Sequence, residues 1–224
     1  MKKLFFVSLF VFVLQFGASA QNSEFNVRMK LANSGDFQSA LVRFRNSFTR
    51  NLSAKKTAQI HYNIGVCLYR LNQADKAIAE FEQAIKLNPN YGKAFYALGM
   101  AFSDSKNFDE AEKAFRSSLK LSNNGETWFD LAIVFFELKK FDESAESFQN
   151  AIKFGSESIG ASHNNLGVVY ALKGNFELAE KQLIVAETLK FEEAKNNLQI
   201  LRKAMITNNI SLIAKLILKE KNER

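Results

Sequence analysis

The sequence predicts an all-α protein built from stacked, antiparallel helix pairs. A motif of about 34 residues occurs twice in succession, over residues 58–91 and 92–124, and such a period is typical of architectures in which each repeat packs on the next. One proline and ten glycines in 224 residues favour helix, because few positions break it. The apolar content of 47% and the charged content of 24% are those of a folded protein.

The first twenty residues have the layout of a secretory signal. Two lysines precede the apolar run Leu4–Phe16, and the small residues Ala18 and Ala20 follow it. This order predicts cleavage before Gln21. The run is shorter than the roughly 20 residues that span a bilayer, which disfavours a retained anchor. No cysteine follows the small residues, so a lipid anchor is not expected. We therefore expect a bacterial protein that is periplasmic or secreted.

Charge is distributed unevenly along the chain. The formal net charge is +7, and loss of the two signal lysines leaves +5. Residues 21–60 carry +5, residues 61–194 carry −5 and residues 195–224 carry +5. Basic ends on an acidic middle favour an acidic partner, an anionic membrane, or association of ends with middles of other copies. A solvated surface with chance asymmetry explains the same counts.

Four repeats share one numbering frame, with first residues at 58, 92, 125 and 160. Position 8 of each unit is always small: Gly65, Gly99, Ala132 and Gly167. Glycine inside a helix costs about 1 kcal/mol relative to alanine. Its recurrence at the same position of the repeat therefore indicates that another helix approaches closely there. Broad rings stand four residues earlier, on the same helical face: His61, Phe95, Trp128 and His163.

The second half of each unit has its own helical pattern. Position 24 is large, namely Phe81, Phe115, Phe148 and Leu183. Small residues flank it at positions 20 and 27: Ala77, Ala111, Ser144 and Ala179, then Ala84, Ser118, Ala151 and Ala186. This spacing predicts a second helix that packs tightly beside the first. Breaks rich in asparagine, such as Asn88-Pro89, end the units.

This pattern resembles the tetratricopeptide repeat family. The matched features are the ring at position 4, the small residues at positions 8, 20 and 27, and the large residue at position 24, over Ala58–Glu193. The resemblance implies a right-handed superhelical solenoid whose first helices line a concave side. The family's proline at position 32 is present only as Pro89; Asn123, Ser156 and Phe191 replace it elsewhere.

The predicted organisation therefore has seven parts. A signal over 1–20 and a degenerate first repeat over 21–57 precede four repeats over 58–91, 92–124, 125–159 and 160–193, with capping helices over 194–224. In the last part, the apolar residues Ile210, Ile213, Leu216 and Ile217 share one helical face with basic edges. A cap would cover the apolar end of the solenoid. A basic amphipathic helix can also lie on a membrane, so membrane contact through residues 210–224 is the alternative.

The sequence contains no recognisable catalytic constellation. His61 and His163 occupy the same core-facing position without ligands at metal-binding spacing, and we expect them to fill the core. Cys67 is predicted to be an inert buried thiol, and a single cysteine cannot form an internal disulfide. The glycines form no phosphate-binding loop. We expect no enzymatic activity, no cofactor, no metal and no nucleic-acid partner.

The first helices carry the predicted binding surface. Aromatic and aliphatic residues at positions 5, 9 and 12 favour a groove for a protein or peptide segment, although such rings also pack on neighbouring units. The candidate residues are Tyr62, Val66, Tyr69, Tyr96, Met100, Phe129, Ile133, Phe136 and Asn164. Family members that clamp acidic C-terminal tails carry Lys at position 5 and Asn at position 9 of the first repeat. Tyr62 and Val66 stand there, so no such clamp is expected.

The leading hypothesis is a non-enzymatic scaffold or adaptor of the bacterial envelope that binds a protein or peptide in an aromatic-lined groove. A membrane-peripheral protein and a self-assembling scaffold are the alternatives, because repeat folds serve many partners. The sequence leaves the partner and the oligomeric state open.

Overall fold

The computed structural model describes residues 30–48 and 51–216, in which all regular structure is helical. The chain divides into two compact units, Met1–Pro89 and Asn90–Arg224, here called unit 1 and unit 2. The predicted signal at residues 1–20 lies outside the described residues. Within the described part, no helix combines the length and the apolar character needed to cross a membrane.

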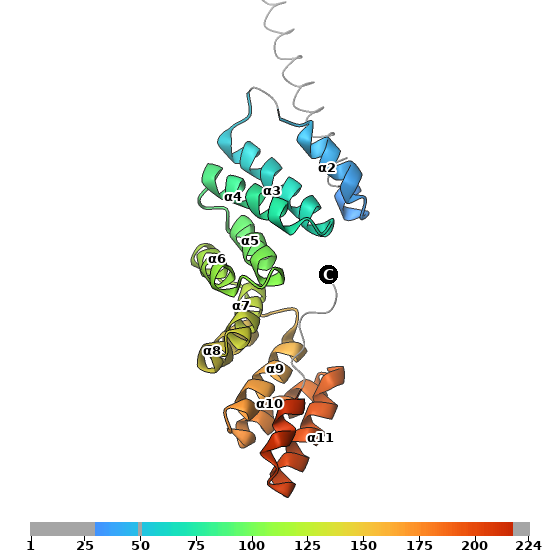
Figure 1. The fold of residues 1–224 in the computed structure, drawn as a ribbon, viewed down its shortest axis with the longest axis vertical. Coiled ribbons are helices and arrows are strands. Elements are labelled where there is room, and N and C mark those ends of the chain that lie inside the picture. Colours follow the sequence, from blue (N-terminus) through green and yellow to red (C-terminus); the bar gives the residue numbers. More distant parts are fainter. Residues whose placement is uncertain (1–29, 49–50, 217–224) are drawn as a thin grey trace, which may run out of the picture. The chain divides into compact units, whose positions relative to one another are not determined.

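Unit 1 contains three described helices, α2 (Phe37–Arg45), α3 (Ala54–Arg70) and α4 (Ala74–Leu87) (Figure 1). α3 packs against both α2 and α4. It begins earlier than the repeat frame at residue 58, because the Ser53 side chain accepts a hydrogen bond from the backbone N–H of Lys56 at 3.3 Å and caps the helix. α2 buries Ala40 and Phe44 and follows a helical stretch that is described over residues 30–33, so it is the second helix of the first repeat.

Unit 2 contains seven α-helices and one 3-10 helix among its described residues. In order they are α5 (Gly92–Asp104), α6 (Phe108–Leu121), α7 (Gly125–Glu137), α8 (Phe141–Lys153), α9 (Ile159–Leu172), α10 (Phe176–Thr188), α11 (Glu192–Thr207) and η1 (Ile210–Lys215). Each first helix packs against its own second helix, and each second helix packs against the next first helix (Figure 1). First helices also meet directly, α5 with α7 and α9 with α11.

The turn inside each helix pair has one geometry. Position 15 is always left-handed, with φ of 56° at Asn72, 60° at Lys106, 58° at Lys139 and 78° at Gly174. The next backbone N–H donates to the carbonyl five residues earlier, at 2.8 to 2.9 Å. This hydrogen bond closes a Schellman motif, which satisfies the carbonyls at the end of the first helix and reverses the chain in a few residues.

The small residues at position 8 lie where the second helix comes closest. A Cβ added to Gly65 or Gly99 would lie 2.5 and 2.7 Å from the rings of Phe81 and Phe115, and at Gly167 it would lie 2.8 Å from Leu183. Real Cβ atoms essentially never come this close. The predicted close approach at this position is therefore confirmed, and the contacting atoms belong to the large residue at position 24.

The C-terminal part of unit 2 covers the last repeat. α11 ends where Asn208 turns left-handed, at φ 49°, and η1 follows. Ile213 of η1 is buried in a cluster with Leu198 and Leu201 of α11. A longer amphipathic helix from Ile210 does not form over the described residues, since the backbone is 3-10 up to Lys215 and extended at Leu216. Residues 217–224, which carry the rest of that expectation, lie outside the described part.

Replacing Gly99 by Ala is expected to lower the free energy of unfolding by about 1–3 kcal/mol, the usual cost of forcing extra volume into a packed core. Gly92 provides the matched control, because a Cβ there would make an ordinary 3.5 Å contact with Leu121. Gly92→Ala should be neutral or slightly stabilising. Urea denaturation followed by circular dichroism measures both variants, and equal stability for the two would contradict the packing constraint.

Candidate functional site

In unit 1, the three predicted residues of α3 share one surface. Tyr62, Val66 and Tyr69 are all half-buried, and their spacing of four and seven residues puts them on one side of the helix. The Tyr62 ring packs on the Phe81 ring with centroids 6.0 Å apart. Burial raises the pKa of Tyr62 above its ordinary value, so its phenol stays neutral at physiological pH. We call these three residues the α3 face.

In unit 2, four of the predicted binding residues are buried: Met100, Phe129, Ile133 and Asn164. A binding surface requires exposed side chains, and these four predicted residues lie in the core instead. Phe129 meets the Phe148 ring edge-on, with centroids 5.6 Å apart, and is part of the core of α7 and α8. Met100 belongs to a second cluster around Phe115. The helical period gives the phase of these positions but not how completely neighbouring elements cover them.

The other two predicted residues of unit 2 are half-buried. The Tyr96 ring packs on Phe115 at 5.9 Å, and its hydroxyl donates to Oδ2 of Asp130 at 2.7 Å. Phe136 packs edge-on against Phe141 at 5.7 Å. Part of each side chain is therefore accessible. Phe115 and Asp130 hold Tyr96 in place, and Phe141 holds Phe136.

Two polar bridges connect successive first helices in unit 2. The hydroxyl of Tyr96 on α5 binds Asp130 on α7 at 2.7 Å. On the other pair, Nδ2 of Asn197 on α11 donates to Oδ1 of Asn164 on α9 at 2.9 Å, and Asn164 in turn donates to Asn165 at 3.1 Å. These are the helix pairs in which first helices meet directly. Buried polar groups are costly without such partners, so the bridges fix how these helices stack.

Three residues of these bridges, Asp130, Asn165 and Asn197, are not among the site residues predicted from the sequence. All three are buried polar residues; Asp130 and Asn197 lie about one repeat from their bridge partners, and Asn165 is bonded to its neighbour Asn164. Asp130 and Asn165 stand at position 6, where the other two repeats have Asn63 and Ala97, so the repeat frame alone does not single them out. The hydrogen bonds of Asn197 and Asp130 join residues 33 and 34 positions apart, and they can be predicted only when it is known which helices are in contact.

The two histidines make the same cross-helix contact. Nδ1 of His61 lies 2.6 Å from Glu80, and Nδ1 of His163 lies 2.7 Å from Gln182. In both units the partner stands 19 residues later, on the second helix. The histidines thus join the helices of a pair through hydrogen bonds as well as by packing. In the described part of the chain, no group of three or more His, Cys, Asp or Glu residues could hold a metal ion.

The single cysteine lies in the core of unit 1. Cys67 is buried, and burial raises the pKa of its thiol to about 11. A nucleophilic cysteine needs a substantial thiolate fraction near neutral pH. The Cys67 thiol is protonated there, so its environment is that of a packing residue.

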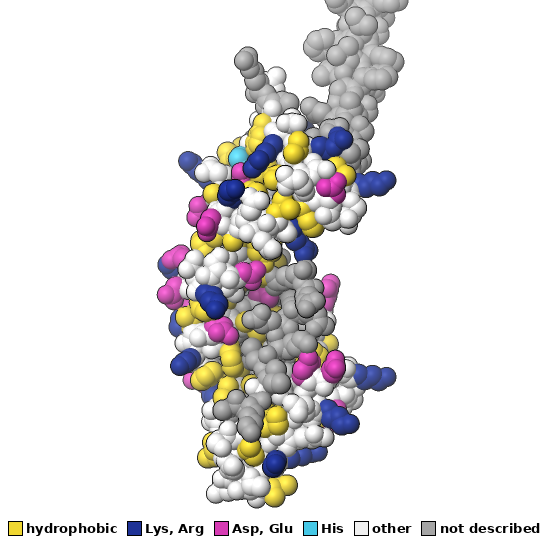
Figure 2. Space-filling model, turned by 45° about the vertical axis from the view of Figure 1, so that its right-hand side comes forward, with side chains coloured by type: hydrophobic (Ala, Val, Ile, Leu, Met, Phe, Trp, Pro, Cys, Tyr) yellow, Lys and Arg dark blue, Asp and Glu magenta, His cyan; other side chains and the backbone are white. Residues whose placement is uncertain are grey.

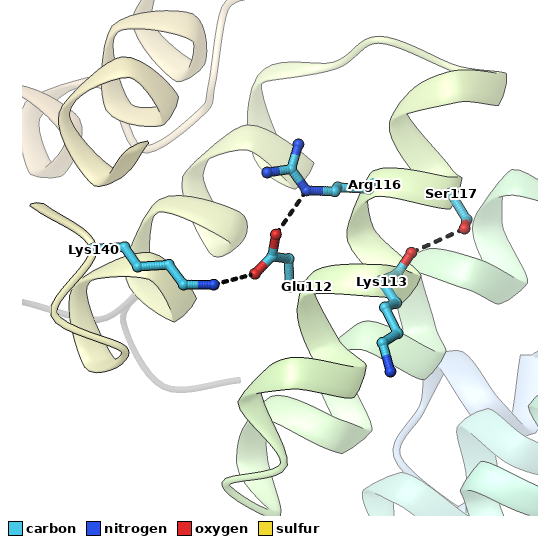
Figure 3. Close-up of polar contacts among 5 residues, drawn as sticks. All are labelled: Glu112, Lys113, Arg116, Ser117 and Lys140. Carbon is cyan, nitrogen blue, oxygen red and sulfur yellow. Dashed lines mark hydrogen bonds and ion pairs between the residues drawn. The ribbon is translucent and has the colours of Figure 1, made fainter. Parts of the chain in front are cut away.

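An ion-pair cluster on the second-helix side joins two repeats. Glu112 on α6 accepts hydrogen bonds from Arg116, one turn later, at 2.8 Å and from Lys140, at the start of α8, at 2.9 Å (Figure 3). Burial alone would raise the pKa of Glu112, but the hydrogen bonds and positive charges of Lys140 and Arg116 outweigh it, so the pKa is lowered. The same two cations lie over the Phe135 ring, at 5.7 and 5.3 Å. The cluster therefore fixes the stacking of the third repeat on the second.

Stacked helix pairs with one repeated packing contact define a helical-repeat scaffold. Two tetratricopeptide repeat models match the chain, one over residues 58–91 and the other over residues 96–159 and 129–188. Together they cover more than half of the sequence. The chain therefore belongs to the tetratricopeptide repeat family. Proteins of this family are generally not enzymes.

Known proteins resemble the chain in part. A tetratricopeptide repeat protein of Arabidopsis thaliana chloroplasts, PYG7, is 39% identical over 67 residues, which are 30% of this chain and 22% of that protein. The chain thus spans less than a quarter of this relative. The PilF structure from Pseudomonas aeruginosa has a TM-score of 0.70 at 15% identity and covers 89% of each chain. YrrB, described as having an unusual peptide-binding site, has a TM-score of 0.60 at 20% identity, over 72% of this chain and 84% of its own. These structures show the fold.

Replacing Glu112 by Gln is expected to lower the free energy of unfolding at pH 7 by about 0.5–1 kcal/mol. A carboxylate whose pKa is lowered by folding stabilises the protein above its unfolded pKa, and this contribution disappears as the pH falls through the folded pKa. The difference between Glu112→Gln and the wild type should therefore vanish in acid. Glu110→Gln is the control, because Glu110 pairs with Lys113 between two exposed side chains of the same helix. Its effect on stability should be smaller than that of Glu112→Gln. An unchanged difference across the pH series would show that the ion pairs contribute nothing.

Proposed function

We propose that the chain is an exported adaptor that binds an extended segment of a partner protein on its first-helix faces. The observation that carries this proposal is the α3 face, where two tyrosines and a valine stay partly accessible on one side of a helix. The membership of a scaffold family and the fold shared with YrrB, which is described as a peptide-binding protein, support the same reading.

The chemistry of the α3 face suits apolar side chains with polar neighbours. Tyrosine offers a broad, rigid ring at a small entropic cost and a hydroxyl that can donate or accept a hydrogen bond. Tyr62 is held in place by the Phe81 ring, so less conformational freedom is lost when a partner binds. Val66 lies between the two tyrosines along the helix and provides apolar contact area. An extended peptide with aromatic or aliphatic side chains fits this surface best.

In unit 2, Tyr96 and Phe136 are the predicted residues that a partner can reach. The buried residues act as supports. Asp130 accepts the hydrogen bond of Tyr96 and thereby fixes the direction of its hydroxyl, while the asparagine bridge holds α9 against α11. The proposed binding residues are accordingly Tyr62, Val66 and Tyr69 in unit 1 and Tyr96 and Phe136 in unit 2, with Asp130 as a positioning residue.

Site-specific photocrosslinking tests the surface. A photoreactive amino acid replaces Tyr69 on the α3 face or, as the control, the exposed Lys86 on α4, and the full chain is expressed in its native cells. We expect discrete protein adducts from position 69 and none from position 86. Adding Tyr62→Ala should reduce the adduct yield at least about tenfold, the effect of losing one aromatic anchor, while circular dichroism stays unchanged. Identical adducts from both positions, or a yield insensitive to Tyr62→Ala, would overturn the proposal.

Export is tested on the chain itself. The layout of residues 1–20 supports removal of this segment, and the intact mass of the protein isolated from native cells should correspond to a chain that starts at Gln21. Because signal cleavage requires small residues before the cut, Ala18→Arg with Ala20→Arg should leave the uncleaved chain. Ser8→Ala, inside the apolar run, is the control and should be processed normally. A full-length mass in the wild type would contradict the proposed export.

A further inference from the structure

The chain that follows α11 folds back onto the first helices of unit 2. Asn208 is left-handed, at φ 49°, and ends α11. The side chain of Asn209 then accepts a hydrogen bond from the backbone N–H of Ser211 and caps η1. η1 packs against α11 and α9, which are both first helices, and any contact with the second helix α10 is weaker than these. η1 therefore lies on the first-helix side of the last repeat.

η1 covers one position of the predicted binding row. Ala171 on α9 stands at position 12 of the last repeat, the position that Phe136 has in the repeat before. It is 2% exposed and belongs to the same buried cluster as Ile213 of η1, which is 4% exposed. Leu216 packs against this cluster as well. The chain itself therefore occupies part of the first-helix face of unit 2, by which we mean positions 5, 9 and 12 of α5, α7 and α9.

We propose that residues 210–224 are an internal ligand of this face and compete there with the partner segment, a competition that rests on the function proposed above. η1 is the described part of the ligand. Residues 217–224 follow it directly and lie outside the described residues. A partner segment must displace them before it contacts Tyr96 and Phe136.

The end of η1 suits this continuation. Leu216 is extended, with φ −65° and ψ 136°, and an extended segment is what the first-helix face binds in the proposed function. The eight residues 217–224 span about 26 Å when extended, whereas packed helices lie about 8–10 Å apart. They are therefore long enough to cross α9 and to reach Phe136 on α7.

The segment and the first helices carry opposite net charges. Residues 210–224 contain four Lys or Arg and two Glu, which gives +2. α5, α7 and α9 together contain one Lys, two Asp and two Glu, which gives −3. Asp104 and Glu137 are exposed and stand at position 13, next to the position 12 row. Figure 2 shows acidic side chains among hydrophobic ones on the surface of unit 2. Such complementarity favours binding of the segment to this face.

The residue types after Leu216 match the side chains that α7 presents. Ile217 and Leu218 are apolar and suit the accessible part of the Phe136 ring, while Lys219 suits the exposed carboxylate of Glu137. A segment that served only as a cap requires none of these residue types, because η1 already covers the end of the last repeat.

Photocrosslinking within the purified full chain tests where the segment lies. A photoreactive amino acid replaces Leu218 or, as the control, Ile206, which is 86% exposed at the end of α11. Unlabelled and isotopically labelled chains are irradiated together, so that crosslinks within one chain are distinguished from crosslinks between two. We expect crosslinks within one chain from position 218 to α7, and none to α7 from position 206. Crosslinks from position 218 that are confined to α11, or that join two chains, would overturn the proposal.

Charge reversal tests the pairing with α7. Glu137→Lys should lower the yield of the crosslink from position 218 to α7 at least about threefold, because it places like charges together, and adding Lys219→Glu should restore the yield to within about twofold. Glu177→Lys on α10 is the matched control, since it makes the same charge change at an exposed residue of a second helix, and it should leave the yield unchanged. Equal yields for the variants of Glu137 and Glu177 would count against the internal ligand.

Competition with the partner is measured in native cells. A photoreactive amino acid replaces Ser103, a half-buried residue at position 12 of α5. Ile217→Asp with Leu218→Asp should raise the yield of partner adducts at least about threefold, because a partner binds only the fraction of molecules in which its face is vacant. An unchanged yield, with adducts still formed at Tyr69, would refute the competition. If neither position forms adducts, the proposed function itself fails, and the crosslinks from position 218 still decide where the segment lies.

Discussion

The contact between the backbone of each first helix and one large side chain of its partner determines the geometry of this protein. A ring or leucine at position 24 lies so close to position 8 that a single additional carbon on Gly65, Gly99 or Gly167 would overlap with it. Dispersion and burial favour such dense contact, and the helices of a pair can then sit in only one relation. Because the contact is internal to a repeat, its recurrence produces the sequence period, while contacts between repeats, such as that of Tyr96 with Asp130, fix the stacking.

The large residue at position 24 also limits how far position 5 is exposed. Its ring packs against the position 24 ring of its own unit in three cases, Tyr62 on Phe81, Tyr96 on Phe115 and Phe129 on Phe148. A tyrosine there buries its ring and keeps an accessible edge, while Phe129 is wholly buried. At position 5, the tyrosines Tyr62 and Tyr96 therefore keep an edge that a partner can reach, whereas Phe129 only supports the core.

The repeat frame, the small residues and the helix pairing were predictable from spacing, because each follows from the period of an α-helix and from side-chain size. The left-handed turns at Lys106 and Lys139 were not, since lysine has no preference for that conformation and only the hydrogen bonds of the turn impose it. The bridges to Asp130 and Asn197 depend on which helices touch. The 3-10 helix at the end also escaped prediction, because the Ile-rich segment has the period of an α-helix, and packing of Ile213 on α11 decides its form.

The outer faces can differ between repeats because they do not take part in the contact at position 8. On α6 this face carries charges, and Glu112 binds Arg116 of the same helix and Lys140 at the start of α8, which holds the next repeat. On α10, Leu178, Ile184 and Val185 stand at positions where the other repeats carry polar residues, yet Ala179, Leu183 and Ala186 remain buried as in the other repeats. A change on the outer face therefore leaves the stack intact and alters only what the repeat can meet in solution.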